Sequence, residues 1–196
     1  MRFKVIYADP PWSYDDRGCQ GAAEAQYALM SNADISRLPV HVLADDDCAL
    51  FMWGTYPLLD VALATIKCWG FEFVGMGFDW VKLNPKALTP CFKLGRMTRG
   101  NTEPCLYARR GRPKRVDAGV AQLIEVDEIV RSPIRRHSAK PPEVRDRIVQ
   151  LMGDVPRIEL FARERAQGWC QTGLELDGID VRDALKMMAA INGRAA

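Results

Sequence analysis

The chain has few of the residue types that most often bind metals. Only two of its 196 residues are histidines, His41 and His137, and its six cysteines include no Cys-x-x-Cys pair. A metal centre and a disulfide framework are therefore not expected, whereas buried free thiols in a reducing cytoplasm are. No apolar run approaches the ~20 residues of a membrane span, and the N-terminus leads into a hydrophobic segment with no signal-peptide pattern.

Several common catalytic signatures are missing as well. The sequence contains no Walker loop, no Gly-x-Gly-x-x-Gly and no Gly-x-Ser-x-Gly, so phosphate cradling, dinucleotide binding and the serine nucleophile elbow lack their usual marks. The composition, with 48% hydrophobic and 27% charged residues, is that of an ordinary soluble protein. A length of 196 residues suits one domain with a sizeable core.

Charge is distributed unevenly along the chain. The net charge is +2, but Lys82 to Arg115 holds ten basic residues and one acid, Glu103, which gives this stretch a charge of +9. Two interpretations stay open: a solvated basic surface, or a face that follows the phosphates of a nucleic acid.

The most informative stretch is Asp9-Pro10-Pro11-Trp12, which directly follows the hydrophobic residues 3–8. Each proline fixes its own φ and restricts the residue before it, so the turn is stiff and extended. The Asp9 carboxylate and the backbone carbonyls can accept hydrogen bonds, and Trp12 offers a flat ring. Acceptors beside a ring suit an exocyclic amino group on a flat heterocycle. The alternatives are a plain rigid turn and a proline-rich docking segment.

Hydrophobic runs alternate with helix signals along the chain. Apolar and β-branched runs predict strands at residues 3–8, 48–55, 71–83, 103–109 and 157–161. Capping and stop signals predict helices from Ser31 to near Pro39, from Thr55 to Gly70, over Val144 to Leu151, and from Asp180 to Gly193. Residues 116–125 have weak helical character and 128–131 suggest a short strand. The alternation predicts one α/β domain, a mostly parallel sheet with helices on both faces.

Three segments are expected to converge because open α/β sheets bind ligands outside the carboxyl ends of their strands. They are Asp9–Trp12, the loop from His137 to Lys140, and Glu159–Arg163 followed by Gly173–Glu175. The loops at 13–27 and 135–142 are the candidate gates to this site.

At these residues the chain resembles a known family. Asp-Pro-Pro-Trp is the motif of the N6-adenine methyltransferases related to the catalytic subunit of the eukaryotic mRNA adenosine methyltransferase, which include bacterial and phage DNA adenine methyltransferases. The similarity extends over nearly the whole chain. It includes Tyr27-x-x-Met30-Ser31, Leu50-Phe51-x-Trp53, Trp69-Gly70-Phe71, Trp80-Val81-Lys82, Arg99-x-Asn101-Thr102-Glu103, His137-Ser138-x-Lys140-Pro141, Glu159–Arg163 and Gly168-Trp169.

The resemblance implies a single Rossmann-like methyltransferase domain over residues 1–196, with S-adenosylmethionine as cofactor and a circularly permuted motif order. The implied catalytic residues are Asp9, Pro10, Pro11 and Trp12. The implied cofactor-binding residues are Asp9, Lys140, Leu160, Phe161, Arg163, Arg165, Gly173 and Glu175. The implied substrate-binding residues are Trp12, Tyr27, Lys82, Arg99, Glu103, Arg136, His137 and Ser138.

Specific roles follow for a few of them. Lys140 would neutralise the methionine carboxylate, and Glu175 would hold ribose hydroxyls. Leu174 departs from the family, whose members often have Asn at that place. Asp9 and the Pro10 carbonyl would accept the N–H groups of adenine, with Trp12 stacked on the base.

The implied activity is methylation of the adenine 6-amino group in DNA, in the cytoplasm of a bacterium or of a phage-infected cell. RNA adenosine methylation is the nearest alternative, and a non-catalytic nucleic-acid-binding partner subunit is the alternative of another class. No membrane partner is expected. A homodimer would extend the basic face.

Overall fold

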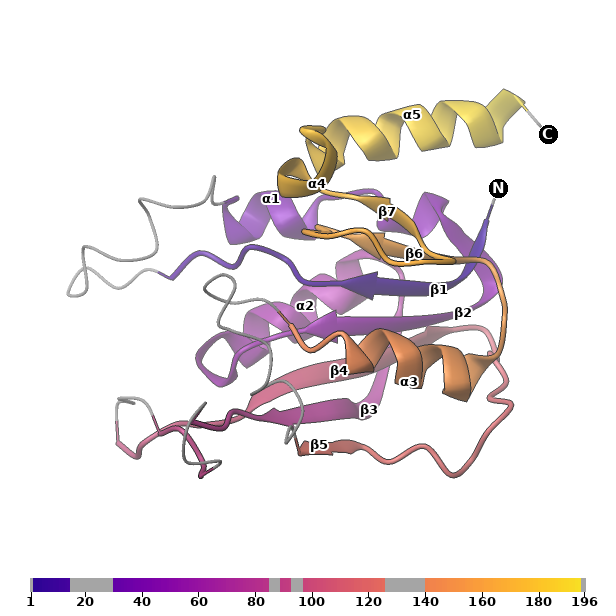
Figure 1. Ribbon diagram of the computed structural model, residues 1–196. Helices are drawn as coiled ribbons and strands as arrows, with labels where there is room; N and C mark the ends of the chain where they lie inside the picture. The colour runs from indigo at the N-terminus through magenta and orange to yellow at the C-terminus, as the bar shows by residue number, and fades with distance from the viewer. Residues whose placement is uncertain (1, 15–29, 85–88, 93–96, 126–139, 195–196) are drawn as a thin grey trace.

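A seven-stranded sheet forms the centre of the protein (Figure 1). The computed structural model describes residues 2–14, 30–84, 89–92, 97–125 and 140–194. The sheet has the strand order β5-β3-β4-β2-β1-β6-β7. Its strands are β1 (Phe3–Ala8), β2 (Ala44–Trp53), β3 (Glu72–Val81), β4 (Glu103–Arg110), β5 (Leu123–Glu125), β6 (Arg157–Leu160) and β7 (Cys170–Thr172).

Most neighbouring strands run parallel, as the sequence predicts. β1 lies parallel to β2 and β6, β6 to β7, and β3 to β5. β4 is the exception, because it runs antiparallel to both β2 and β3. The central position of β1 places its carboxyl end, where the acidic turn begins, between the carboxyl ends of β2 and β6.

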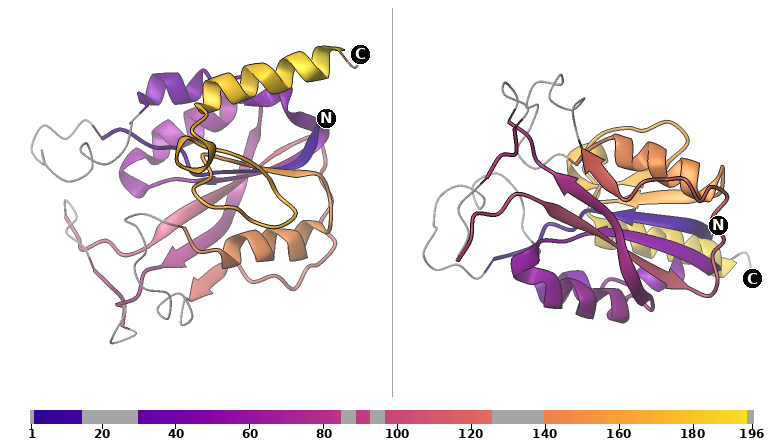
Figure 2. Two further views of the ribbon diagram at one scale, coloured as in Figure 1. Left: turned by 45° about the horizontal axis from the view of Figure 1, so that its top comes forward. Right: turned by 90° about the horizontal axis from the view of Figure 1, so that it is seen from below.

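Helices cover both faces of the sheet, which confirms the predicted α/β layers (Figure 2). One face carries α1 (Asn32–Ser36), α2 (Leu59–Cys68) and α5 (Val181–Arg194), and the other carries α3 (Glu143–Met152). Ile66 and Leu185 belong to the first core cluster, and Val144 and Ile148 belong to the second. Because both faces are covered, most of β1 and the part of β2 from Cys48 to Trp53 are apolar and buried, with Ile6 and Leu50 fully buried.

Most of the helix signals act as predicted. The Ser31 hydroxyl accepts from the Asp34 amide at 3.1 Å, and Asp180 Oδ1 accepts from the Arg182 amide at 2.8 Å, so each side chain caps the helix that follows it. Gly70, with a φ of +83°, lets the chain turn out of α2.

The predicted helix cap at Thr55 is wrong. Thr55 makes no side-chain cap bond, and a short 3₁₀ turn, Tyr56–Leu58, precedes α2. The Thr55 hydroxyl accepts a hydrogen bond from Tyr14 instead. A threonine before a helix therefore serves here to join two loops.

Residues 116–125, whose sequence is ambiguous with weak helical character, do not form a helix. Residues 116–122 are irregular with several bends, and residues 123–125 form β5, which pairs with β3 over three residues. β7 and the single turn α4 (Leu174–Asp177) were not foreseen, because three or four residues are too few for a periodic pattern. The strand expected at 128–131 lies outside the described residues.

The basic stretch does not form one continuous face. β4 runs alongside β2 and β3 over its full length, and at ~3.3 Å per residue its two ends lie roughly 25 Å apart. Glu103 therefore lies at the carboxyl end of β1 and β2, whereas Arg109 and Arg110 lie at the other end, where they contact Glu72 and the His41 carbonyl. Lys86, Lys93 and Arg96 lie outside the described residues. The prediction of a single +9 surface is corrected accordingly.

Within the part of the chain that the structure describes, no helix is both long and apolar enough to cross a membrane. The cysteines that it describes are free thiols, as predicted; Cys48 and Cys105 are buried, but Cys68 and Cys170 are exposed.

Candidate active site

The acidic turn begins where β1 ends. The Trp12 amide donates to the Pro10 carbonyl at 2.9 Å, which closes a tight turn of the kind that the two prolines favour. The Trp12 indole N–H donates to the carbonyl of Trp53 at 3.0 Å. The turn is therefore bonded to the end of the neighbouring strand β2. Its carboxylate, Asp9, is held at the carboxyl end of β1 with 15% of its side chain exposed.

Trp53 is the support on which this turn rests. Its side chain is fully buried, and its indole N–H donates to the Tyr7 hydroxyl at 2.6 Å. The ammonium of Lys140 lies 5.5 Å from the Trp53 ring centre, within the range of a cation–π interaction. One tryptophan thus contacts the strand that precedes the turn, the turn itself and the lysine that faces it.

A row of charged side chains with alternating sign crosses the carboxyl ends of the central strands. Its members, called the charge row below, are Lys82, Glu103, Lys140, Asp9, Arg163 and Glu175. Each of these side chains is at most 27% exposed, so a nearby opposite charge is needed to offset the loss of solvation.

The Asp9 end of the charge row is closely spaced. Lys140 Nζ lies 2.9 Å from Asp9 Oδ1 and 3.4 Å from Glu103 Oε2. On the other side, the Arg163 guanidinium lies 3.9 Å from Asp9 Oδ2 and 3.5 Å from Glu175 Oε1. The two oxygens of Asp9 therefore face different cations. Oδ1 is within hydrogen-bonding distance of Lys140, whereas Oδ2 is too far from Arg163 for a hydrogen bond.

Mutual pairing dominates the protonation of this row. Burial lowers the pKa of Lys140, but the carboxylates of Asp9 and Glu103 outweigh burial, so that the pKa stands above its ordinary value. Burial raises the pKa of Glu103, and Lys140 with Lys82 outweighs it, so that this pKa stands below its ordinary value. Both groups are therefore charged at neutral pH.

The end of β6 forms the opposite wall. Phe161 has a φ of +62°, a left-handed conformation that costs a residue other than glycine of order 1 kcal/mol. Ala162 donates to the Thr172 carbonyl at 2.9 Å, and a Cβ added to Gly173 would overlap the backbone of Ala162. Close backbone packing therefore requires glycine at 173 and fixes the turn that carries Arg163.

A buried polar network supports this wall from behind. Glu159 accepts two hydrogen bonds from Arg145, at 3.0 and 3.1 Å, and one from Gln171 at 2.6 Å. Burial raises the pKa of Glu159, and Arg145 opposes that effect. Because Arg145 belongs to α3 and Glu159 to β6, the pair fixes the start of α3, and with it Lys140, against β6.

Comparison with known proteins agrees with this geometry. The family model described as MT-A70 matches residues 3–175. The chain belongs to the MT-A70 family. It is 31% identical to the Type II methyltransferase M.MunI of Mycoplasma sp., over 89% of this chain and 78% of that protein.

Eukaryotic members of the MT-A70 family match over a smaller part of their own length. The N(6)-adenosine-methyltransferase catalytic subunit METTL3 of Homo sapiens is 31% identical over 93% of this chain, and the MT-A70-like protein of Drosophila melanogaster is 31% identical over the same share. This chain spans 30% and 28% of those two proteins. Family membership makes the chain a methyltransferase and agrees with the observed α/β fold.

The MT-A70 site residues expected from the sequence fall into three groups: those brought together, those placed elsewhere and those outside the described residues. The structure brings together the charge row, with Phe161 and Gly173 packed beside it. Arg165 is exposed, Arg99 donates to the Phe92 carbonyl at 3.3 Å, and Leu160 is fully buried in the core. Pro10, Pro11 and Trp12 form the acidic turn with Asp9, and four expected residues lie outside the described residues: Tyr27, Arg136, His137 and Ser138.

Two expected roles are changed by the structure. Trp12 has 7% of its surface exposed and packs in the core, so it supports the turn and does not present an open stacking face. Lys140 is paired with Asp9 and Glu103, so the methionine carboxylate assigned to it would have to compete with these partners. Both changes follow from loop packing, which a linear sequence does not show.

Sequence reasoning gave no individual role to Trp53, Arg145 or Tyr14, although Tyr14 lies in a loop taken as a candidate gate. Trp53 lies in a strand that reads as core, and its contacts involve its carbonyl and indole N–H. Arg145 was hidden among the charged residues of an amphipathic helix. Only Tyr14 had a usable signal, its position two residues after the Asp-Pro-Pro-Trp motif.

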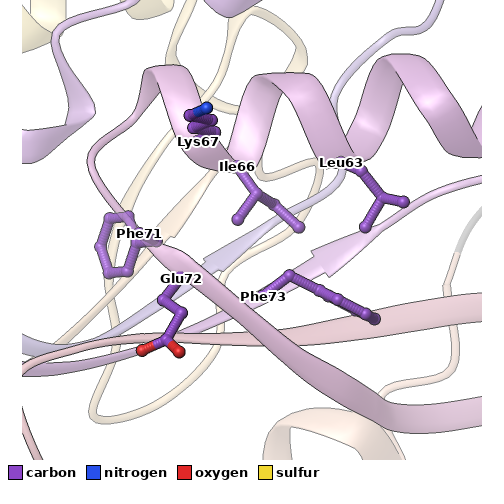
Figure 3. A pocket seen from close by; sticks show the side chains of 6 residues that line it. All are labelled: Leu63, Ile66, Lys67, Phe71, Glu72 and Phe73. Atoms are coloured by element: carbon purple, nitrogen blue, oxygen red, sulfur yellow. The ribbon is translucent and has the colours of Figure 1, made fainter.

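A separate hollow of about 410 Å³ lies between α2 and the start of β3 (Figure 3). Its lining is mostly apolar: Leu63, Ile66, Lys67, Phe71, Glu72 and Phe73. It lies at the end of β3 that pairs with Arg109, whereas Glu103 pairs with the other end. The hollow is therefore distinct from the charge row.

Proposed function

We propose that this protein transfers a methyl group from S-adenosylmethionine to the 6-amino group of adenine in DNA. The observation that carries the proposal is the Asp9 carboxylate, fixed at the carboxyl end of β1 with one oxygen held by Lys140. Arg163 lies 3.9 Å from the second oxygen, beyond hydrogen-bonding distance. That oxygen keeps lone pairs with which to accept an N–H group.

The residues at the site suit the cofactor. Lys140 and Arg163 would hold its carboxylate, and Glu175 would accept hydrogen bonds from its ribose. Leu174, 51% exposed, offers no polar side chain, so the ribose contacts fall to Glu175 and to the backbone of the Gly173 turn. The cofactor supplies a methyl group activated by a sulfonium sulfur.

Asp9 and Pro10 would prepare the amine. The nitrogen lone pair of adenine is delocalised into the ring, which makes it a poor nucleophile. Hydrogen bonds from its two N–H groups to Asp9 Oδ2 and the Pro10 carbonyl would favour a pyramidal nitrogen with the lone pair directed out of the plane. The Pro10 carbonyl already accepts from Trp12, and its second lone pair remains for this role. The nitrogen would lose one proton only after it has gained the methyl group, so no strong base is needed and positioning and electrostatics would supply most of the rate.

The choice of adenine rests on the site and on the relatives. The METTL3 proteins are named N(6)-adenosine methyltransferases, and the acceptor turn suits an exocyclic amine. The match over 78% of a Type II methyltransferase favours the DNA branch of the resemblance over the RNA branch. RNA adenosine remains the second candidate, because the identity to METTL3 is also 31%.

The test is methyl transfer from tritiated S-adenosylmethionine to duplex DNA, single-stranded DNA and RNA in parallel. Digestion of each product to nucleosides and mass spectrometry would identify the modified base. We expect N6-methyladenine in DNA, absent with Asp9→Ala. Product only in RNA would support the second candidate. If calorimetry detects no cofactor binding by the wild-type protein, the chain is a non-catalytic subunit and the proposal fails.

A further inference from the structure

Tyr14 is an exposed aromatic residue directly beyond the acidic turn. Its residue surface is 45% exposed, yet its hydroxyl donates to the Thr55 hydroxyl at 2.9 Å. Thr55 follows the end of β2, so this bond joins the loops that leave two adjacent parallel strands. The phenol is therefore fixed at its tip although much of the ring faces solvent.

The backbone beside Tyr14 is fixed as well. The Ser13 amide donates to Asn32 Oδ1 at 3.1 Å, and Asn32 Nδ2 donates to the Ser13 carbonyl at 2.9 Å. Asn32 is the first residue of α1, so the loop is held to a helix on the face of the sheet. With one bond at the hydroxyl and a pair at the preceding residue, the Tyr14 ring has little freedom to move.

Tyr14 also lies within the electrostatic reach of the charge row. Burial raises the pKa of its phenol and the bond to Thr55 lowers it, while the charges of Glu103, Lys140 and Asp9 act on it further. Geometry places the ring beside the acceptor turn: Tyr14 follows Trp12 by two residues, and its hydroxyl is held by Thr55 just beyond the end of the adjacent strand β2.

We propose that the ring of Tyr14 is the surface on which the base addressed by Asp9 stacks, with Thr55 as the residue that positions it. The inference rests on the proposed function, because it assumes a base at the acceptor turn. It follows from the burial of Trp12, which leaves the stacking role open. A fixed, half-exposed ring loses little conformational entropy when a base covers it, and every base has a face suited to it.

The first test separates stacking from charge and does not need methyl transfer. Fluorescence anisotropy would compare binding of an oligodeoxyadenosine and of an abasic oligomer with the same length and charge. We expect Tyr14→Ala to weaken binding of the oligodeoxyadenosine about tenfold, the size of one lost base–aromatic stack, and to leave the abasic oligomer unchanged. Equal loss for both oligomers, or no loss for either, would overturn the proposal.

The second test uses kinetics where the wild type transfers methyl. Tyr14→Ala should raise the KM for DNA about tenfold, with the Kd for S-adenosylmethionine unchanged by calorimetry. Tyr14→Phe keeps the ring and loses only the bond to Thr55, so its KM for DNA should be about threefold above that of the wild type. Thr55→Val, which removes the same bond, should have a similar KM. The matched control is Phe73→Ala, which removes a ring that is 42% exposed at the separate hollow.

The experiments distinguish failure of the stacking role of Tyr14 from failure of the proposed function. An active wild type with an unaffected Tyr14→Ala rejects the stacking role and leaves the proposed function standing. An inactive wild type rejects the function, and the comparison of the two oligomers still decides whether Tyr14 stacks on bases.

Discussion

The ammonium of Lys140 lies 2.9 Å from Oδ1 of Asp9. This contact couples the residue assigned to the amine with a residue assigned to the cofactor. A ligand carboxylate that draws Lys140 toward itself would leave both Asp9 oxygens to the amine. The charge on Asp9 is thereby shared between two tasks of one reaction.

The first prediction concerns the Asp9 carboxylate. Asp9→Asn keeps the shape of the side chain but replaces one acceptor oxygen with a donor, so the amine loses its partner. We expect kcat to fall at least a hundredfold, as when one preorganised hydrogen bond is lost elsewhere, and the melting temperature to move by only a few degrees. Single-turnover kinetics and thermal unfolding would measure the two effects. Near-normal kcat would contradict the mechanism.

The second prediction concerns pH and Glu103. Burial raises the pKa of Glu103, but Lys140 and Lys82 bring it below its ordinary value. A carboxyl group whose pKa is lower in the folded than in the unfolded state stabilises the fold fully at any pH above its unfolded-state pKa, which is about 4.3 for Glu. That contribution is lost as the pH falls through the folded-state pKa. The stability of the wild type relative to Glu103→Gln should therefore be greatest near pH 7 and shrink toward pH 3. Denaturation with urea across this range would measure it; a difference that grows toward acid would refute the assignment.

A third prediction distinguishes support from stacking at Trp12. Trp12→Phe removes the bond to the Trp53 carbonyl and part of the buried surface, at a cost of about 1–2 kcal/mol in the free energy of unfolding. Trp12→Ala should cost about 3–5 kcal/mol. At a temperature where it stays folded, Trp12→Phe should keep the wild-type preference for an oligodeoxyadenosine over an abasic oligomer. Selective loss of that preference would restore Trp12 as the stacking ring.

The fourth prediction concerns the backbone contact at Gly173. A Cβ at this position would overlap the Ala162 backbone, whereas a Cβ at Gly75 in β3 would meet no atom within 4 Å. Gly173→Ala should destabilise the protein by about 1–3 kcal/mol and weaken cofactor binding, because the turn that carries Arg163 must shift. Gly75→Ala serves as the matched control. Equal melting temperatures for the two variants would show that the turn adapts freely.

The sequence predicts the layers of this fold well, because apolar runs and capping residues act locally. The strand at 3–8 and the capped helix after Ser31 are such cases. The direction of β4 could not be predicted in this way, since side chains alternate identically along a strand whether it runs up or down. The same limit misplaced Arg109 and Arg110, which were assigned to one face with Lys82.

The site shows a similar division. Asp9 and Arg163 could be brought together because each follows a strand, β1 or β6, and parallel neighbouring strands end on the same side of the sheet. Lys140, just before α3, was placed with them through the loop that begins at His137. The ion pairs among these residues could not be predicted, because the partner of a buried cation depends on which loop folds over it. Trp12 illustrates this point: its residue type suggests stacking, but its indole N–H finds the Trp53 carbonyl.

The charge row contains three cations and three anions, so its formal charges cancel. A polyanion that approaches the protein therefore experiences almost no attraction from this row beyond a Debye length, about 8 Å at physiological ionic strength. The rate at which the polyanion associates with the protein must depend on basic residues outside the charge row. The salt dependence of its binding must depend on them as well. Chemistry and long-range capture of the polymer are thus assigned to different parts of the surface.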